Sequence, residues 1–299
     1  AGRRRHRRNR RNDRFNHGKM NLVTLRDVSV AYDGYEALRH VDLEIADLDF
    51  LGVIGPNGGG KTTLLYEMAG FCVKNDQKVL VTTSTHIYRP PKEWHDQSLE
   101  AVERKFRTGR AAIIGSACRD PEKLSMPETE LFEAARKKAD LTLIEADGAR
   151  HLPCKAPAEH EPALLSSSDL VIGVTGLSAL GQPLGKGCFR AERAAELLGC
   201  TMEHHITEED LARLIASEQG QQKDLKGRTF YAVLHQYEEK EHRAAAEKLV
   251  ELLRRQGIEH VLVTCATGNR RQSGENTNPW YGRAELPVRE AEEEWEPGE

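Results

Sequence analysis

The stretch Gly55-Pro56-Asn57-Gly58-Gly59-Gly60-Lys61-Thr62 decides the fold class of this chain. It satisfies the pattern G-x-x-x-x-G-K-[ST], whose glycines let the backbone curl and point successive N–H groups at phosphate oxygens. A short apolar run at residues 50–54 precedes it, which is typical of a buried strand. A helical pattern at residues 61–69, closed by Gly70, follows. Strand, glycine loop and helix in this order predict a phosphate-binding loop, because the helix dipole also attracts anions.

The residue types of the loop indicate how it would hold a nucleotide. Lys61 is expected to face solvent, outside the core, and to bridge the β- and γ-phosphates, and the Thr62 hydroxyl is expected to bind Mg²⁺. Thr83 follows another predicted strand, where a hydroxyl can meet phosphate. The alternative, a glycine-rich turn that happens to contain a lysine, fits less well because both flanks match the motif. The residues expected to contact nucleotide are Gly55, Asn57, Gly58, Gly59, Gly60, Lys61, Thr62, Thr63 and Thr83.

Beyond the loop, short apolar runs alternate with amphipathic stretches. The runs predict strands at residues 79–82, 111–114, 141–144, 170–174, 231–234 and 260–263, and the amphipathic stretches predict helices at 98–107, 127–139 and 239–256. Two stretches before the loop, 22–30 and 37–45, predict an antiparallel pair. This alternation predicts a three-layer α/β P-loop NTPase domain at residues 21–265, with a mostly parallel sheet covered on both faces.

The two ends of the chain differ in charge from the rest. Residues 1–20 are rich in arginine and residues 266–299 in glutamate, although the net charge is only −4. Such compositions cannot bury enough apolar surface to offset chain entropy, so both ends are predicted to be disordered tails. A nucleic-acid-binding arm is the weaker interpretation of the basic end, because no aromatic residues alternate with its arginines.

The remaining composition favours a cytoplasmic protein. No stretch approaches the roughly 20 apolar residues that span a bilayer. The six cysteines are scattered without a C-x-x-C pair, which is typical of reduced thiols in a cytosolic protein.

Two carboxylates follow the predicted strand at residues 141–144. Glu145 and Asp147 lie two residues apart and share one side of an extended chain, so both could face the phosphates. We assign Glu145 to hold magnesium through water, and Asp147 to orient water or bind the metal, with their order left open. The predicted catalytic residues are therefore Lys61, Glu145 and Asp147, and the predicted metal ligands are Thr62, Glu145 and Asp147.

The segment that follows is dense in reactive side chains between prolines. Arg150, Cys154, Lys155, His160 and Glu161 lie within it, next to the predicted magnesium carboxylates. This density favours a substrate-binding loop, and a solvated connector is the alternative. No tight pair spacing supports a zinc site here.

The end of the predicted strand at residues 231–234 bears on which base is bound. Many GTPases carry Asn-Lys-x-Asp at this place, but here the chain has His235-Gln236-Tyr237. ATP is therefore expected in preference to GTP, with Mg²⁺ as the metal.

Residues 22–65, LVTLRDVSVAYDGYEALRHVDLEIADLDFLGVIGPNGGGKTTLL, resemble the start of an ABC-transporter ATPase. That resemblance implies that the Tyr32 ring stacks on adenine. The rest of the chain lacks an LSGGQ-type signature and an apolar run ending in Asp-Glu, so it could not form the usual composite site. An ABC-type transport ATPase subunit or fragment is therefore an alternative interpretation.

A longer part of the chain, from about residue 61 to 265, resembles the selenium-dependent hydroxylase accessory protein family called YqeC. The resemblance rests on GGKTTL at the loop, VLVTTSTHIYRP (79–90), LIEADGARHLPCKAPAEHEP (143–162), VIGVTGLSALGQPL (171–184) and CFRAERAAELLG (188–199). It implies a P-loop NTPase that assists maturation of selenium-dependent molybdenum hydroxylases, with such a hydroxylase or a cofactor-assembly protein as partner. A non-hydrolysing, nucleotide-dependent binding switch is the second alternative.

Overall fold

The computed structural model describes residues 21–32, 35–46, 50–55, 61–147, 152–236 and 239–264. The predictions of two disordered tails, and those for Asn57, Gly58, Gly59, Gly60 and Arg150, lie outside these residues. The predictions for the side chains of Tyr32 and Thr63 also lie outside what the structure describes.

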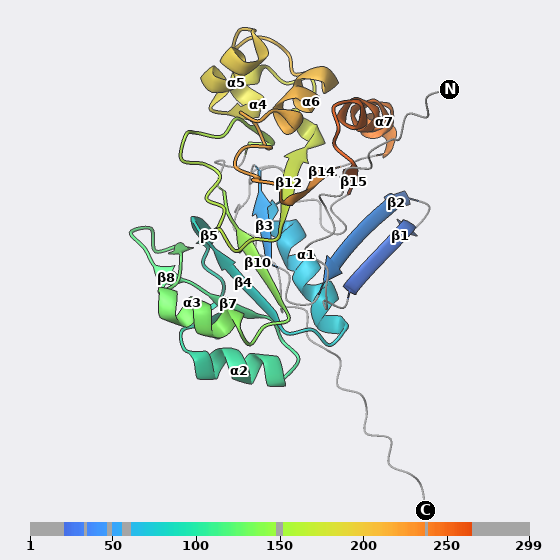
Figure 1. Cartoon of the computed structure of the whole chain (residues 1–299). Coiled ribbons are helices and arrows are strands. Elements are labelled where there is room, and N and C mark those ends of the chain that lie inside the picture. The colour runs from blue at the N-terminus through green and yellow to red at the C-terminus, as the bar shows by residue number, and fades with distance from the viewer. Residues whose placement is uncertain are drawn as a thin grey trace, which may run out of the picture.

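A parallel sheet forms the centre of the molecule (Figure 1). Its strand order is β15-β14-β12-β3-β10-β4-β7-β6, and neighbouring strands pair in parallel throughout. The bounds are β3 (Phe50–Ile54), β4 (Val79–Thr83), β6 (His95–Asp96), β7 (Ala112–Ile114), β10 (Leu141–Glu145), β12 (Leu170–Gly176), β14 (Thr229–His235) and β15 (His260–Val263). The strand that leads into the glycine loop, β3, thus lies between β12 and β10.

Helices pack on both faces of this sheet, because its strands are apolar on both sides. In β10, Leu141 and Leu143 pack in the cluster that contains α1 (Lys61–Lys74), whereas Ile144 packs in the cluster on the other face. The second cluster receives side chains from α2 (Leu99–Arg107), α3 (Thr129–Arg136), α5 (Ala191–Leu198), α6 (Glu208–Ala216) and α7 (Glu239–Arg255). This arrangement confirms the predicted three-layer α/β fold with a mostly parallel sheet.

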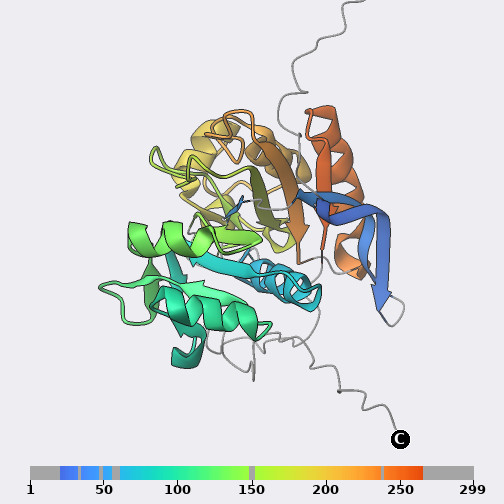
Figure 2. The same ribbon diagram turned by 60° about the horizontal axis from the view of Figure 1, so that its bottom comes forward.

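An antiparallel hairpin, β1 (Asn21–Tyr32) with β2 (Tyr35–Ala46), precedes the main sheet, as the alternating pattern predicts. It forms a two-stranded sheet of its own. The hairpin lies beside β15 (Figures 1 and 2), at the edge of the molecule that is far from α2 and α3.

Short strands outside the main sheet were not predicted, because two or three residues are too few for a periodic pattern. They are β5 (His86–Tyr88), β8 (Ser116–Ala117), β9 (Lys123–Ser125), β11 (Cys154–Lys155) and β13 (Cys188–Phe189). β11 and β13 pair in parallel. The first of them, β11, comes shortly after β10 along the chain. The helices α4 (Leu184–Gly187), α5 and α6 were likewise not predicted.

The helix after the glycine loop is longer than predicted. It does not stop at Gly70 but continues to Lys74, because Cys72 and Val73 of its last turn are buried in the core. Tertiary packing here outweighs the roughly 1 kcal/mol by which glycine disfavours a helix. The predicted helix at 98–107 is confirmed as α2, with Ser98 accepting a hydrogen bond from Ala101 as its N-cap. In the part of the chain that the structure describes, no helix has the length and apolar character needed to cross a bilayer.

Candidate functional site

The site begins where β3 ends at Gly55. This glycine has a φ of +115°, and a Cβ built on it would lie 2.1 Å from the carbonyl oxygen of Val174 in neighbouring β12. Only glycine can adopt this conformation without strain and at this distance. The first residue of the phosphate motif is therefore fixed by its approach to β12.

Lys61 is the first residue of α1 and is fully buried. Its Nζ lies 2.6 Å from Oε1 of Glu145 and also donates to the backbone carbonyl of Asp147. The prediction that Lys61 faces solvent outside the core is therefore wrong. The reason is that the buried Glu145 carboxylate attracts the ammonium group.

The hydroxyls of Thr62 and Thr83 also donate hydrogen bonds to Glu145. The Thr62 hydroxyl donates to Oε2 of Glu145 at 3.0 Å, and the Thr83 hydroxyl donates to the Glu145 backbone carbonyl at 2.8 Å. A threonine hydroxyl and a carboxylate side by side are oxygen ligands of the type that Mg²⁺ prefers, and Mg²⁺ usually keeps several waters besides one or two protein ligands. The residues present therefore fit the metal that the motif implies.

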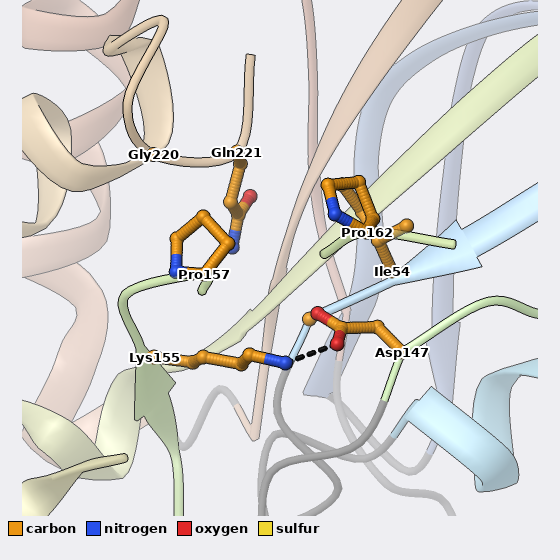
Figure 3. A pocket seen from close by; sticks show the side chains of 8 residues that line it. Ile54, Asp147, Lys155, Pro157, Pro162, Gly220 and Gln221 are labelled. Carbon is orange, nitrogen blue, oxygen red and sulfur yellow. Dashed lines mark hydrogen bonds and ion pairs between the residues drawn. The ribbon is translucent and has the colours of Figure 1, made fainter. Parts of the chain in front are cut away.

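Asp147 is held at its backbone carbonyl by Lys61 and at its carboxylate by a second lysine. The carboxylate is paired with Lys155, as the dashed line in Figure 3 shows. Burial raises the pKa of the Asp147 carboxyl above its ordinary value, although the charges of Lys155 and Lys61 oppose the shift. Glu145 thus pairs with Lys61 and Asp147 with Lys155, and the expectation that both carboxylates face the phosphates stays a prediction.

Lys155 connects this carboxylate to a second acidic residue. Its Nζ lies 2.8 Å from Glu161, which also forms a two-pronged ion pair with Arg190. Burial opposes ionisation of Glu161, but hydrogen bonds from Arg190 and Lys155 outweigh it and hold the pKa of this carboxyl below its ordinary value. Asp147, Lys155, Glu161 and Arg190 therefore form a continuous chain of ion pairs that extends from the end of β10 to the N-cap of α5.

Lys223 holds the backbone around Glu161. The ammonium group of Lys223 donates to the carbonyls of Ala158, Glu159 and Glu161. A small pocket lies between this segment and the end of β3 (Figure 3). Its lining residues are Ile54, Gly55, Asp147, Lys155, Pro157, Pro162, Gly220 and Gln221.

The residues of the predicted substrate loop separate into two groups. Lys155 and Glu161 join the ion-pair chain, and Cys154 lies buried against Cys188. His160 is exposed on the surface. Arg190 and Lys223 were missed by the sequence reasoning. Arg190 lies in the quoted stretch CFRAERAAELLG, which was the available signal, whereas nothing in the sequence distinguishes Lys223.

The end of β14 carries a buried histidine. His235 Nδ1 lies 2.7 Å from the Thr264 hydroxyl after β15, and burial lowers the pKa of His235 to about 4. The next residue, Gln236, accepts a hydrogen bond from Ser178 at 2.7 Å. The last residue of β14 is therefore a buried, neutral imidazole.

The chain is similar to known proteins over much of its length. The family model described as YqeC protein matches residues 53–192. This range contains the site residues from Gly55 to Arg190. The resemblance to the YqeC family is confirmed. The uncharacterized protein YqeC of Escherichia coli strain K12 is 28% identical over 227 residues, which are 71% of this chain and 85% of that protein.

The chain is also similar to ATP-binding subunits of importers. The spermidine/putrescine import ATP-binding protein PotA of Clostridioides difficile strain 630 is 40% identical over 165 residues, covering 55% of this chain but only 46% of PotA. Among solved structures, a chain of the MinC:MinD cell division complex of Aquifex aeolicus is 12% identical with a TM-score of 0.38, covering 71% of this chain and 79% of that chain. At this score the likeness carries no conclusion.

Proposed function

We propose that this YqeC-like chain is a magnesium-dependent nucleoside triphosphatase that prefers ATP to GTP. The observation that carries the proposal is the meeting of Lys61 and Thr62, at the start of α1, with the Glu145 carboxylate at the end of the neighbouring strand β10. A lysine, a hydroxyl and a carboxylate at one edge of a parallel sheet supply a phosphate cation and two magnesium oxygens. The similarity to an import ATP-binding protein over 55% of this chain supports this proposal.

Each of these side chains has a task that its position allows. Lys61 would leave Glu145 to neutralise phosphate charge, and Thr62 with Glu145 would hold the metal and its waters. The metal, when bound, supplies charge neutralisation on the β- and γ-phosphate oxygens. Asp147 would orient the attacking water once its carboxylate is released from Lys155.

The client of this activity is proposed from the YqeC resemblance. We expect the chain to act as an accessory factor in the maturation of a selenium-dependent molybdenum hydroxylase, with residues 152–163 contacting the hydroxylase or a cofactor-assembly protein. Support comes from the buried ion pairs that link Lys155, and through it Glu161, directly to the Asp147 carboxylate after β10. Co-purification of the chain with such a hydroxylase, weakened by Lys155→Met, would test this part.

Replacement of Lys61 tests the nucleotide site. We expect Lys61→Arg, which can keep the ion pair with Glu145, to fold normally and to lose phosphate release in a single-turnover assay with Mg²⁺ and ATP. Lys61→Ala should lose nucleotide binding as well, and should unfold more easily by about 3–5 kcal/mol, since it leaves a buried carboxylate unpaired.

Lys74→Ala is the matched control, because Lys74 is an exposed lysine at the opposite end of the same helix. It should hydrolyse ATP like the parent chain. A folded Lys61→Arg protein with parental turnover would contradict the assignment of this loop. Nucleotide binding without any phosphate release by the parent chain would instead favour the non-hydrolysing switch.

A further inference from the structure

Two buried thiols face each other directly behind Lys155. The sulfur atoms of Cys154 and Cys188 are 3.2 Å apart, and each side chain is about 2% exposed. The two residues are partners in register on the parallel pair β11–β13, with the Ala156 amide donating to the Phe189 carbonyl at 3.1 Å. Their approach is therefore set by strand pairing and not by a chance contact of mobile side chains.

This placement suits a covalent bond between the sulfurs. Adjacent strands lie about 4.8 Å apart, which falls within the range of roughly 4.4–6.8 Å that disulfides span between Cα atoms. The sulfurs need to approach by only about 1 Å to reach the bond length near 2.0 Å. In the described part of the chain, both thiols are free in this structure.

We propose that Cys154 and Cys188 are an oxidation site that forms an intramolecular disulfide by exchange with a low-molecular-mass disulfide. The Cys188 thiolate attacks one sulfur of the small disulfide, which forms a mixed disulfide and releases one small thiol. The Cys154 thiolate then attacks the Cys188 sulfur and releases the second small thiol. The two cysteines lose two protons and two electrons, and the small disulfide gains both.

The order of the two cysteines follows from their hydrogen bond. Cys154 donates to the Cys188 sulfur, and the Cys188 thiol in turn donates to the Phe189 carbonyl at 3.7 Å. The hydrogen bond to Cys188 and burial raise the pKa of the Cys154 thiol well above its ordinary value. Cys188 is therefore the attacking residue and Cys154 the one that completes the disulfide.

The bond would fasten the two strands that carry the ion-pair chain. Lys155 follows Cys154, and Arg190 lies two residues after Cys188 with its guanidinium 4.4 Å from the Phe189 ring centroid. Both cations bind Glu161. Resting on the proposed function, we expect the oxidised chain to bind nucleotide as the reduced chain does, but to lose the nucleotide-dependent change in protease protection of residues 152–163.

The experiment uses the full wild-type chain with oxidised glutathione as the probe. After incubation, free thiols are blocked with N-ethylmaleimide and tryptic peptides are identified without reduction. We expect the six thiols to fall to four, and peptide 151–155 to be linked to peptide 187–190. Glutathione adducts on Cys154 or Cys188 without this linkage, a linkage between other cysteines, or no loss of thiols would each overturn the proposal.

Variants and nucleotide assays separate the two parts of the inference. Cys154→Ala and Cys188→Ala should each abolish the linked peptide, whereas Cys72→Ala, which removes a buried cysteine of α1, should leave it unchanged. The peptide result needs no nucleotide, so it stands or fails even if the chain does not hydrolyse ATP. A linked peptide with unchanged nucleotide-dependent protection would confirm the oxidation site and contradict its effect on the loop.

Discussion

The residues of the site show which contacts a sequence pattern predicts and which it does not. The pattern of glycines, Lys61 and Thr62 predicts a lysine and a hydroxyl at the start of a helix, and Glu145 after a strand predicts the nearby carboxylate. The turning of the Asp147 carboxylate toward Lys155 could not be predicted, because it depends on a strand pair of two residues, β11 with β13, that brings Lys155 beside it. Local patterns do not encode such a distant partner.

His235 gives a prediction about acid stability. Its pKa is lowered to about 4 by burial, from an ordinary value of 6.5. The unfolded chain therefore binds the proton more tightly, so the contribution of His235 to stability is present above pH 6.5 and is lost as the pH falls toward 4. Between pH 7 and pH 5 this loss is about 2 kcal/mol for a shift of this size.

We expect His235→Gln to flatten that part of the stability profile, measured by urea unfolding at pH 7 and pH 5. His86→Gln, at an exposed histidine, serves as the control and should keep the parental profile. An unchanged pH dependence in His235→Gln would show that other groups govern acid unfolding.

The ion pair between Asp147 and Lys155 gives a second prediction at this scale. Because both side chains are buried, Lys155→Met should destabilise the chain by about 3–5 kcal/mol by leaving carboxylates without their cation. Asp147→Asn should also impair hydrolysis if Asp147 orients water. The double variant should be more stable than the sum of the single effects predicts, as a double-mutant cycle of urea unfolding would show. Strict additivity would mean that the pair is not energetically coupled.

Elements with a clear apolar run or amphipathic period were predicted, whereas the shortest strands and the helices α4, α5 and α6 were missed. Each main strand from β3 to β15 other than the two-residue β6 has a run of apolar residues, and the alternation with helices predicts parallel pairing. The sequence does not contain the order of the strands in any local pattern, because order depends on which helix crosses which face. The end of α1 was missed because the burial of Cys72 and Val73 outweighs the glycine signal at Gly70.

The contact between β3 and β12 gives a prediction for these elements. Gly55→Ala places a methyl group against the Val174 carbonyl at a φ of +115°, so we expect a loss of about 3 kcal/mol or more in the free energy of unfolding. Gly181→Ala is the matched comparison, since its φ is +74° with no atom within 4 Å of the added carbon. It should cost only about 1 kcal/mol of backbone strain. Equal losses of unfolding free energy in the two variants would mean that β12 shifts to accommodate the added methyl group.

For the molecule as a whole, the three-layer architecture followed from the sequence, whereas the placement of the β1–β2 hairpin did not. The alternating residues of the hairpin predict an antiparallel pair, but its position beside β15 depends on contacts across more than 200 residues of sequence. The same reasoning applies to the site, which gathers residues from β3, β10, β11 and the segment before α5.

The segment between Glu145 and Glu161 leads to a prediction that involves the whole site. Its first residues surround Lys61, and Lys155 and Glu161 continue the ion-pair chain, so a nucleotide that displaces Lys61 should alter the entire segment. We expect limited proteolysis within residues 145–161 to differ between ADP and a non-hydrolysable ATP analogue. Mass mapping of the cleavage sites gives the measurement, with cleavage in α7 as the internal reference. Identical patterns in the two states would make the segment an ordinary connector.

The pairing of Lys61 with Glu145 has a consequence for how the chain would choose its ligand. Glu145 acts as an intramolecular competitor for the ammonium group, so an incoming phosphate must replace a charged partner that is already in place. Apparent affinity falls by the fraction of molecules in which Lys61 is released. A nucleotide alone would leave the Glu145 carboxylate buried and uncompensated, whereas a nucleotide that arrives with Mg²⁺ gives that carboxylate a new cation. The pairing of Lys61 with Glu145 would thereby favour the metal–nucleotide complex over the free nucleotide.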